Sequence, residues 1–487
     1  MEWTALKTVG ELEKSGYQSR SIKDELRDNL QTKLINKTSI FEGIIGYEDT
    51  VIPQIKRAIL SKHDINLLGL RGQAKTRIAR SMIELLDEYI PIIAGSDIND
   101  DPFCPISHFG KSLKAEKGKE TPIEWVHRSE RFFEKLATPD VTVADLIGDI
   151  DPIKAATLKL SYADERVIHF GMIPRANRCI FVINEIPDLQ ARIQVALFNI
   201  LQEGDIQIRG FKMRLPLDVN FIFTANPEDY TNRGSIVTPL KDRIGSQILT
   251  HYPLSIEIGK QITAQEVIRE VTSDAIKVPE SAKTLLEQIV FEARESPYID
   301  ANSGVSARMS ITMYENLVSA AHLRMLQNGE KTTVVRLSDF DAIIPSITGK
   351  VELVYEGEQL GAEQVAHQLI GSAIKTLFNQ EFRPIKKLKK PGVSDEFDSI
   401  VQWFMETENF ELITGAVDKK YAEQLNQIAP LNAVIDQYHP TSDEVECTFL
   451  KELLLWGLVE YQLLSKYKNA AGISFADEIL GSIYGRE

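Results

Sequence analysis

The sequence predicts an α/β fold in which a parallel sheet is covered by helices on both faces and is followed by a largely helical region. Short apolar runs of strand length lie at 65–68, 179–183 and 219–224. Helical patterns alternate with these runs, and the one at 50–61 has its apolar positions on one face. Continuous apolar strands that alternate with helices are typical of a parallel sheet buried on both faces. After about residue 256 the strand patterns fade and helical patterns dominate.

The size and composition of the chain limit its class. Its 487 residues are too many for one hydrophobic core, so several domains are expected. The net charge of −15 argues against broad nucleic-acid binding, and no nucleic-acid partner is expected. Three scattered cysteines suit a reducing compartment. No stretch has the pattern of a signal peptide or reaches the roughly 18 apolar residues of a membrane span, so we expect a cytoplasmic protein.

A glycine-containing loop at 69–76, with the sequence GLRGQAKT, follows the first apolar run and precedes a helical stretch at 77–86. It nearly fits the phosphate-loop pattern G-x-x-x-x-G-K-[ST]. Glycines let backbone N–H groups turn toward phosphates, and the next helix directs its positive end at them. Lys75 can reach the outer phosphates, and the Thr76 hydroxyl can ligate Mg²⁺, so ATP and Mg²⁺ are the expected cofactors. The candidate contacts in and beside the loop are Gly69, Arg71, Gly72, Gln73, Ala74, Lys75, Thr76 and Arg77.

The loop departs from the pattern at Ala74, which stands where the last glycine is usual. A methyl group there costs about 1 kcal/mol if the backbone has a positive φ, and little if it does not. The conformation of Ala74 therefore decides how well this loop is formed.

The second apolar run ends in Asn184-Glu185, where a phosphate-loop protein usually has two acids. The first acid of such a pair holds magnesium through water, and the second polarises the attacking water. Asn184 can still hydrogen-bond metal-bound water, but it brings no charge. We therefore expect weaker magnesium binding and place the rate of hydrolysis in question, while Glu185 keeps the role of general base open.

The order of these motifs resembles the AAA+ clade that contains magnesium-chelatase I subunits and MoxR ATPases. The resemblance covers roughly residues 40–345. Beside the motifs above, it is carried by 137–151, which resembles the start of an insertion into the clade's second helix, and by 171–178, which resembles the segment leading into its acidic strand. An alternating pattern at 205–215 lies where the clade has a hairpin.

The resemblance implies roles for further residues. Asn226 matches the first sensor, which orients the water beside Glu185. Arg243 matches the arginine finger that stabilises γ-phosphate charge in a neighbouring subunit. Arg308 matches the second sensor, which reaches the nucleotide from the lid. Arg178 is a further candidate for an inter-subunit arginine. The segment whose backbone contacts adenine is matched by Ile44, Ile45 and Gly46.

Together the patterns and the resemblance divide the chain into four regions. These are an N-terminal helical segment at 1–40, an AAA+ nucleotide-binding domain at 41–256, a helical lid at 257–350 and a C-terminal helical region at 351–487. Within the second region we expect a surface insertion at 97–140, a helix-2 insert at about 141–173 and the hairpin at 205–215. A basic stretch at 383–392 is interpreted as a solvated linker rather than as a contact for an anion.

Three functions fit this reading. The first is a Mg²⁺-dependent ATP hydrolase that acts as a motor or chaperone of MoxR type and remodels a partner protein. The second is a magnesium-chelatase ATPase subunit that drives magnesium into a porphyrin, although Ala74 resembles the MoxR side. The third is a scaffold that binds ATP without hydrolysing it. The resemblance implies a homo-oligomeric ring, expected to be a hexamer, and a separate partner with a von Willebrand A domain.

One further group has near-ligand spacing for a metal. Cys104, His108 and His127 lie in the expected insertion. A structural zinc site needs four ligands of defined geometry, and only three can be named, so we interpret these as loop residues without a metal.

Overall fold

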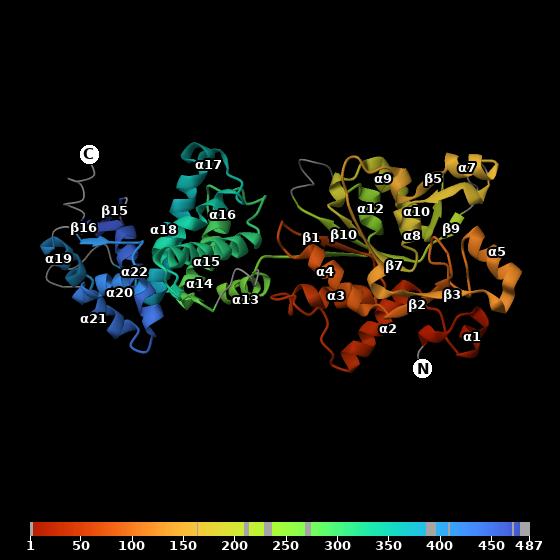
Figure 1. The fold of residues 1–487 in the computed structure, drawn as a ribbon. Coiled ribbons are helices and arrows are strands. Elements are labelled where there is room, and N and C mark those ends of the chain that lie inside the picture. Colours follow the sequence, from red (N-terminus) through yellow and green to blue (C-terminus); the bar gives the residue numbers. More distant parts are fainter. Residues whose placement is uncertain are drawn as a thin grey trace. The chain divides into compact units, whose positions relative to one another are not determined.

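The computed structural model describes residues 3–162, 164–208, 214–227, 236–267, 274–385, 396–407, 410–469 and 472–477. The chain divides into two compact units, Met1–His251 and Tyr252–Glu487 (Figure 1).

The first unit is built on a five-stranded sheet with the order β11-β1-β10-β7-β4. All four pairings are parallel, as in the register Ile65↔Ile222 between β1 and β10. The three apolar runs of the sequence form β1, β7 and β10, so the predicted parallel α/β sheet is confirmed. The strands are β1 (Ile65–Leu68), β4 (Phe132–Leu136), β7 (Cys179–Asn184), β10 (Val219–Ala225) and β11 (Ser246–Leu249).

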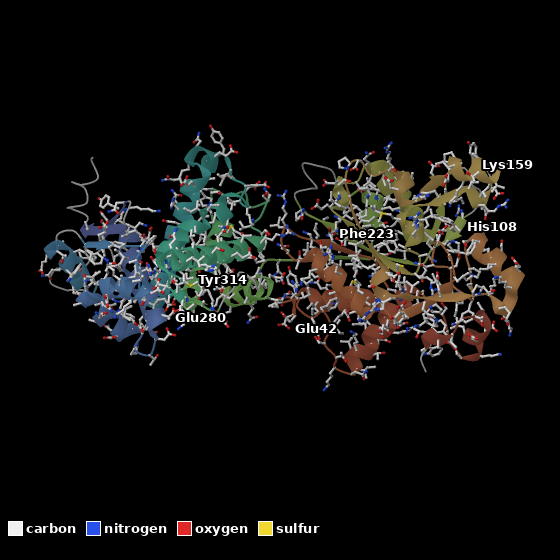
Figure 2. All side chains as sticks on the ribbon, in the orientation of Figure 1. Glu42, His108, Lys159, Phe223, Glu280 and Tyr314 are labelled. Carbon is white, nitrogen blue, oxygen red and sulfur yellow. The ribbon has the colours of Figure 1, made fainter. Side chains whose placement is uncertain are left out.

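Helices cover both faces of this sheet because side chains alternate along each strand. On β7, Ile180 and Val182 pack in the cluster that includes α2, α3 and α4, whereas Phe181 and Ile183 pack in the cluster with α8, α9, α10 and α12. Phe223 of β10 is fully buried inside the unit (Figure 2). The described α-helices of the unit are α1 (Val9–Lys14), α2 (Ile22–Ile35), α3 (Val51–Leu60), α4 (Lys75–Ser81), α5 (His108–Lys117), α6 (Val143–Leu146), α7 (Pro152–Leu158), α8 (Met172–Arg175), α9 (Ala191–Ala196), α10 (Phe198–Glu203) and α12 (Thr238–Arg243).

The segment 97–140 corrects one expectation. We predicted a surface insertion there, but its last part is β4, which pairs with β7 as an edge strand of the central sheet. Charged Glu134 and Lys135 interrupt its apolar pattern, which edge strands tolerate because one side is open. Arg131, which precedes β4 and is 1% exposed, donates two hydrogen bonds of 2.7 Å to Glu25 of α2.

Among its described residues, the first unit also has three antiparallel strand pairs. They are β2 (Tyr89–Ile93) with β3 (Ile123–His127), β5 (Gly148–Ile150) with β6 (Ile168–Phe170), and β8 (Asp205–Gln207) with β9 (Arg214–Pro216). The last pair lies in the expected hairpin at 205–215, of which 209–213 lie outside the described residues.

The second unit is mainly helical, and one hydrophobic cluster runs from Ile276 to Phe475 through the segments expected as lid and as C-terminal region. Its helices are α13 (Ile256–Glu266), α14 (Glu280–Glu295), α15 (Arg308–Asn328), α16 (Ile344–Thr348), α17 (Tyr355–Leu360), α18 (Ala362–Glu381), α19 (Asp398–Glu406), α20 (Asp418–Asn426), α21 (Ala429–Tyr438) and α22 (Glu444–Glu460).

The second unit also has strands that the sequence pattern did not predict. Its strands are the parallel pair β12 (Ile276–Lys277) and β13 (Thr333–Val334) and the antiparallel sheet of β14 (Phe410–Leu412), β16 (Ile473–Asp477) and β15 (Leu464–Lys468). Of the expected linker at 383–392, residues 386–392 lie outside the described part. Among the described residues, no helix is long and apolar enough to cross a membrane.

Candidate functional site

The loop 69–76 connects β1 to α4, so it lies at the carboxyl edge of the sheet, where parallel α/β proteins bind ligands. Gly72 has φ +73°, a conformation that favours glycine. A Cβ on Gly69 would collide with the side chains of Thr250 and Gln73, so the close packing at the base of the loop also requires glycine. Ala74 has φ 54° and ψ 17°, so the methyl group is in the costly left-handed region.

The Lys75 ammonium lies against its own loop. It donates to the carbonyl oxygens of Gly69 and Leu70, the latter at 2.9 Å, and to Oδ1 of Asn226 at 2.8 Å. An ammonium has three N–H donors, and these acceptors are all neutral. A phosphate group would offer Lys75 charged oxygens in their place, and Asn226, the expected first sensor, is already at hydrogen-bond distance from this lysine.

The expected catalytic pair lies at the end of β7, two strands from the loop. Thr224 of β10 connects the pair to the sheet: its hydroxyl accepts from the Glu185 N–H at 3.1 Å and donates to Oδ1 of Asn184 at 3.1 Å. Glu185 itself has φ 56° and is half-buried. Its carboxylate makes no hydrogen bond or ion pair with the described residues, so it is available to water.

Asn184 has a charged neighbour that the sequence did not indicate. Its Nδ2 donates to Oε1 of Glu134 on β4 at 2.6 Å. The other oxygen of Glu134 accepts from Nε and Nη2 of Arg80 on α4, at 2.9 and 2.8 Å. A polar line therefore runs along the carboxyl edge of the sheet from Lys75 to Glu134 and returns to the phosphate-loop helix at Arg80.

A second residue that the sequence did not indicate, Tyr47, braces the loop by hydrogen-bonding to its backbone. Its hydroxyl lies 3.0 Å from the carbonyl oxygen of Gln73 and 2.7 Å from that of His251. The side chain is 6% exposed and packs edge-on against the His251 ring, with 4.9 Å between the ring centroids. Gln73 is held a second time, because its Oε1 accepts from the Thr250 hydroxyl at 2.7 Å. Loop 69–76 is thus tied to the last residues of the first unit.

The segment expected to contact adenine directly precedes Tyr47. Ile44 is buried, whereas Ile45 and Gly46 are half-buried. Gly46 has φ +82°, and its N–H donates to the Glu48 carboxylate at 3.1 Å. The brace from Tyr47 to Gln73 therefore places this segment next to the base of the phosphate loop.

The three candidate arginines have different surroundings. Arg243 ends α12 and is half-buried; it donates to Gln202 at 3.0 Å and to the Pro239 carbonyl at 2.7 Å. Arg308 lies in the second unit, where it is exposed and begins α15. Arg178 is only 5% exposed and is held within the first unit, as by its bond to the Pro91 carbonyl at 2.8 Å, so it is unsuited to reach another subunit.

The candidate metal ligands of the insertion do not gather. Cys104 and His108 are both exposed, and His108 points outward from α5 (Figure 2). Within the described part of the chain, no three His, Cys, Asp or Glu side chains form a group that could hold a metal ion.

Comparisons with known proteins show what this chain is similar to. Residues 123–244, which include β7, β10 and α12, match the AAA domain of the dynein-related subfamily. The chain is 24% identical over 249 residues to the magnesium-chelatase 38 kDa subunit of Cereibacter sphaeroides, which covers 48% of this chain and 65% of the relative. It is 26% identical over 210 residues to the chloroplastic magnesium-chelatase subunit ChlI-1 of Arabidopsis thaliana, which covers 42% of this chain and 46% of the relative.

Residues 123–244 therefore carry an AAA domain, and over a little less than half of its length the chain is similar to magnesium-chelatase subunits. It spans about half to two thirds of the length of these relatives. Among solved structures, a magnesium-chelatase BchI–BchD complex chain is 18% identical, with a TM-score of 0.33, and the match covers 66% of this chain and 98% of that chain. NtrX of Brucella abortus is 15% identical, with a TM-score of 0.35, and the match covers 63% of this chain and 58% of that chain.

Proposed function

We propose that this chain binds ATP and Mg²⁺ at loop 69–76 and hydrolyses the ATP to remodel a partner protein, as a motor or chaperone of MoxR type. The observation that supports this most is the polar line at the carboxyl edge of the sheet, where Asn226, Asn184 and Glu185 lie at neighbouring strand ends and Asn226 contacts Lys75 at the start of α4.

In this proposal each side chain has one task. Lys75 exchanges the neutral acceptors of its loop for the outer phosphates, and Thr76 ligates Mg²⁺. Glu185, whose carboxylate is not engaged by the described residues, polarises the attacking water, while Asn226 orients that water. Arg308 would reach the same nucleotide from the lid, the region that we assign to 257–350.

The missing charge at Asn184 has a candidate source in Glu134. We propose that the Glu134 carboxylate, 2.6 Å from Asn184, supplies the negative charge that attracts Mg²⁺ or its bound water. An aspartate at 184 would face this carboxylate at the same short distance, and two like charges there would repel each other. An amide at 184 and an acid at 134 therefore form a matched pair.

The expected partners come from the resemblance to the clade. A ring of identical subunits, expected to be a hexamer, would present Arg243 to the nucleotide of the next subunit, and a protein with a von Willebrand A domain is the expected partner. A second candidate function is that of a magnesium-chelatase ATPase subunit, which the names of the relatives favour. The alanine at position 74 instead resembles the MoxR side of the clade and favours the first function.

ATP turnover, measured against Mg²⁺ concentration, tests the proposal. We expect Glu185→Gln to lower turnover about 100-fold or more while ATP binding remains, and Lys75→Ala to abolish both. Glu130→Gln, at an exposed glutamate elsewhere in the first unit, is the matched control. Wild-type binding of ATP without turnover, even with candidate partners present, would leave the scaffold function instead.

Exchanging the two side chains tests Glu134 separately. We expect Glu134→Gln, which removes the negative charge, to raise the Mg²⁺ concentration that gives half-maximal turnover, and Asn184→Asp, which adds a second one, not to raise it. The double variant Glu134→Gln/Asn184→Asp keeps one acid and one amide and should recover most of the loss. Unchanged magnesium dependence in Glu134→Gln would exclude this role.

A further inference from the structure

A cavity away from the phosphate loop lies where the N-terminal segment meets the β2–β3 pair. The backbone of this segment joins β3 through bonds of 3.0 Å from Val9 to Thr121 and from Ile123 to Lys7. Beneath it, Val9, Leu12 and Ile123 form a small hydrophobic cluster. A cavity of about 720 Å³ remains beside this cluster, a volume within the usual range of ligand sites. Figure 1 shows α1 and β3 well apart from α4.

Four aromatic side chains line the cavity: Trp3, Tyr17, Tyr89 and Trp125. Trp3 packs edge-on against Tyr17 with 5.6 Å between the ring centroids, and Tyr17 packs in the same way against Trp125 at 6.3 Å. The Trp125 indole is fixed by a 3.0 Å hydrogen bond to the Leu6 carbonyl. Trp3 is 40% exposed and Tyr89 is 41% exposed, so two rings remain open to a ligand.

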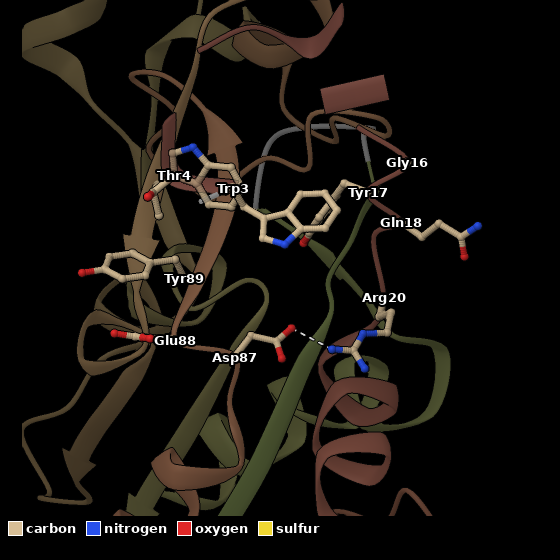
Figure 3. Close-up of a pocket in the computed structure, with 10 residues that line it drawn as sticks. Trp3, Thr4, Gly16, Tyr17, Gln18, Arg20, Asp87, Glu88 and Tyr89 are labelled. Carbon is tan, nitrogen blue, oxygen red and sulfur yellow. Dashed lines mark hydrogen bonds and ion pairs between the residues drawn. The ribbon is translucent and has the colours of Figure 1, made fainter. Parts of the chain in front are cut away.

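Carboxylates line the opposite side of the cavity, below the Trp3 ring (Figure 3). Asp87 is paired with Arg20 at 2.7 Å, and Arg20 is shared with Asp28 at 3.1 Å. Glu88 is exposed, and its carboxylate has no ion pair with the described residues. The guanidinium of Arg20 is therefore already paired with two carboxylates, and Glu88 gives the cavity lining an excess negative charge.

We propose that this cavity binds a basic side chain, lysine or arginine, of a partner protein. A cation over the face of tryptophan or tyrosine is attracted by the ring, and the excess carboxylate of Glu88 adds an ion pair. The same charge disfavours phosphate groups and nucleic acid. This cavity is separate from the proposed ATP site, so binding to it can be tested without a nucleotide.

Binding of a small peptide tests this directly. The probe is acetyl-Gly-Lys-Gly-amide, with its Nε-acetylated form as the neutral comparison, titrated into the full chain and followed by tryptophan fluorescence and ligand-observed NMR. We expect saturable binding of the lysine peptide, weakened by salt, and little binding of the acetylated form. Trp3→Ala should weaken binding about threefold to thirtyfold, and Glu88→Gln about twofold to fivefold.

The controls separate this site from a loss of fold and from the ATP site. Glu88→Gln changes an exposed side chain and should leave the unfolding temperature unchanged, and Glu130→Gln should bind the peptide like the wild type. ATP turnover of the Trp3 and Glu88 variants should equal that of the wild type whether or not the proposed ATPase activity is found. Equal binding of the acetylated peptide, absence of saturable binding, or wild-type binding by both variants would overturn the proposal.

Discussion

The carboxyl edge of the sheet in the first unit and a buried network in the second unit both bring cationic side chains to oxygen acceptors, but the acceptors differ. At the edge, three acceptors of Lys75 are neutral: two carbonyls of its own loop and the amide of Asn226. In the second unit, Arg336 is 2% exposed and lies 2.6 Å from the Asp418 carboxylate. An incoming anion can replace neutral acceptors, whereas a charge matched by a charge in a packed core has no place for one.

The network of the second unit extends beyond this pair. The Arg336 guanidinium lies over the Tyr421 ring, 3.9 Å from its centroid, and the Tyr421 hydroxyl donates to Glu452. Glu452 also accepts from the Leu337 N–H at 3.0 Å. We infer that substitutions here affect stability and that substitutions at the sheet edge affect the nucleotide. The following predictions test this contrast.

The largest effect is expected for Arg336→Ala. Removal of the Arg336 guanidinium breaks one of the two ion pairs of Asp418, the other being with Arg324 at 3.0 Å. It also leaves the carbonyl oxygens of Thr414 and Ala416 without this donor, and should destabilise the second unit by about 3–5 kcal/mol. Calorimetric unfolding of the full chain measures this. Lys419→Ala removes a cation whose side chain is 89% exposed, and it should change stability by less than about 1 kcal/mol. Similar losses in the two variants would contradict the structural role of the network.

Glu452 should make the second unit more stable in acid. Burial raises the pKa of its carboxyl from 4.5 to about 7. Between these values the folded chain keeps a proton that the unfolded chain has lost, so this group's contribution is fully present below pH 4.5 and is lost as the pH rises through 7. The difference is on the order of 3 kcal/mol.

The variant Glu452→Gln isolates this contribution. A glutamine resembles the protonated acid, with its oxygen accepting from Leu337 and its amide donating to the Tyr421 oxygen. The unfolding temperature of the variant should therefore depend less on pH than that of the wild type between pH 5 and 8. Glu358→Gln, at an exposed glutamate of the same unit, should keep the wild-type dependence. Parallel curves for Glu452→Gln and wild type would show that the carboxyl is already ionised at pH 5.

Strands buried on both faces were predictable from the sequence, and strands with an open side were not. β1, β7 and β10 lie inside the sheet, so each is predominantly apolar. β4 and β11 are the two edges, where polar side chains are tolerated and the pattern is lost. The same reason applies to β15, an edge strand of its sheet whose five residues include two lysines.

The site divides in a similar way. Loop 69–76 is local, so its spacing alone indicated phosphate binding. Tyr47 and Glu134 depend on contacts with His251 and Asn184, which lie 204 and 50 residues away in the sequence. No spacing rule connects such residues before the strand order is known. The positive φ of Ala74 also had to be seen in the structure, because alanine occurs in helices as readily as in this turn.

Tyr47→Phe tests how firmly the loop is braced. The change leaves the carbonyls of Gln73 and His251 without their shared donor, at a cost of about 1–3 kcal/mol. Because one of these carbonyls belongs to loop 69–76, ATP affinity should fall as well. Fluorescence titration with an ATP analogue and thermal unfolding measure the two effects. Loss of stability with wild-type ATP affinity would show that the brace does not shape the loop.

The smallest effect is expected for Ala74→Gly. In the folded chain glycine removes the left-handed strain of about 1–2 kcal/mol, but it also gains about 0.5–1 kcal/mol of freedom in the unfolded chain. The net result should be a stabilisation of about 0.5–1 kcal/mol. Ala115→Gly makes the same chemical change in the exposed helix α5 and should instead destabilise by about 1 kcal/mol. Opposite signs in thermal unfolding would establish that the conformation of Ala74, and not glycine itself, determines the outcome; the same sign in both would contradict it.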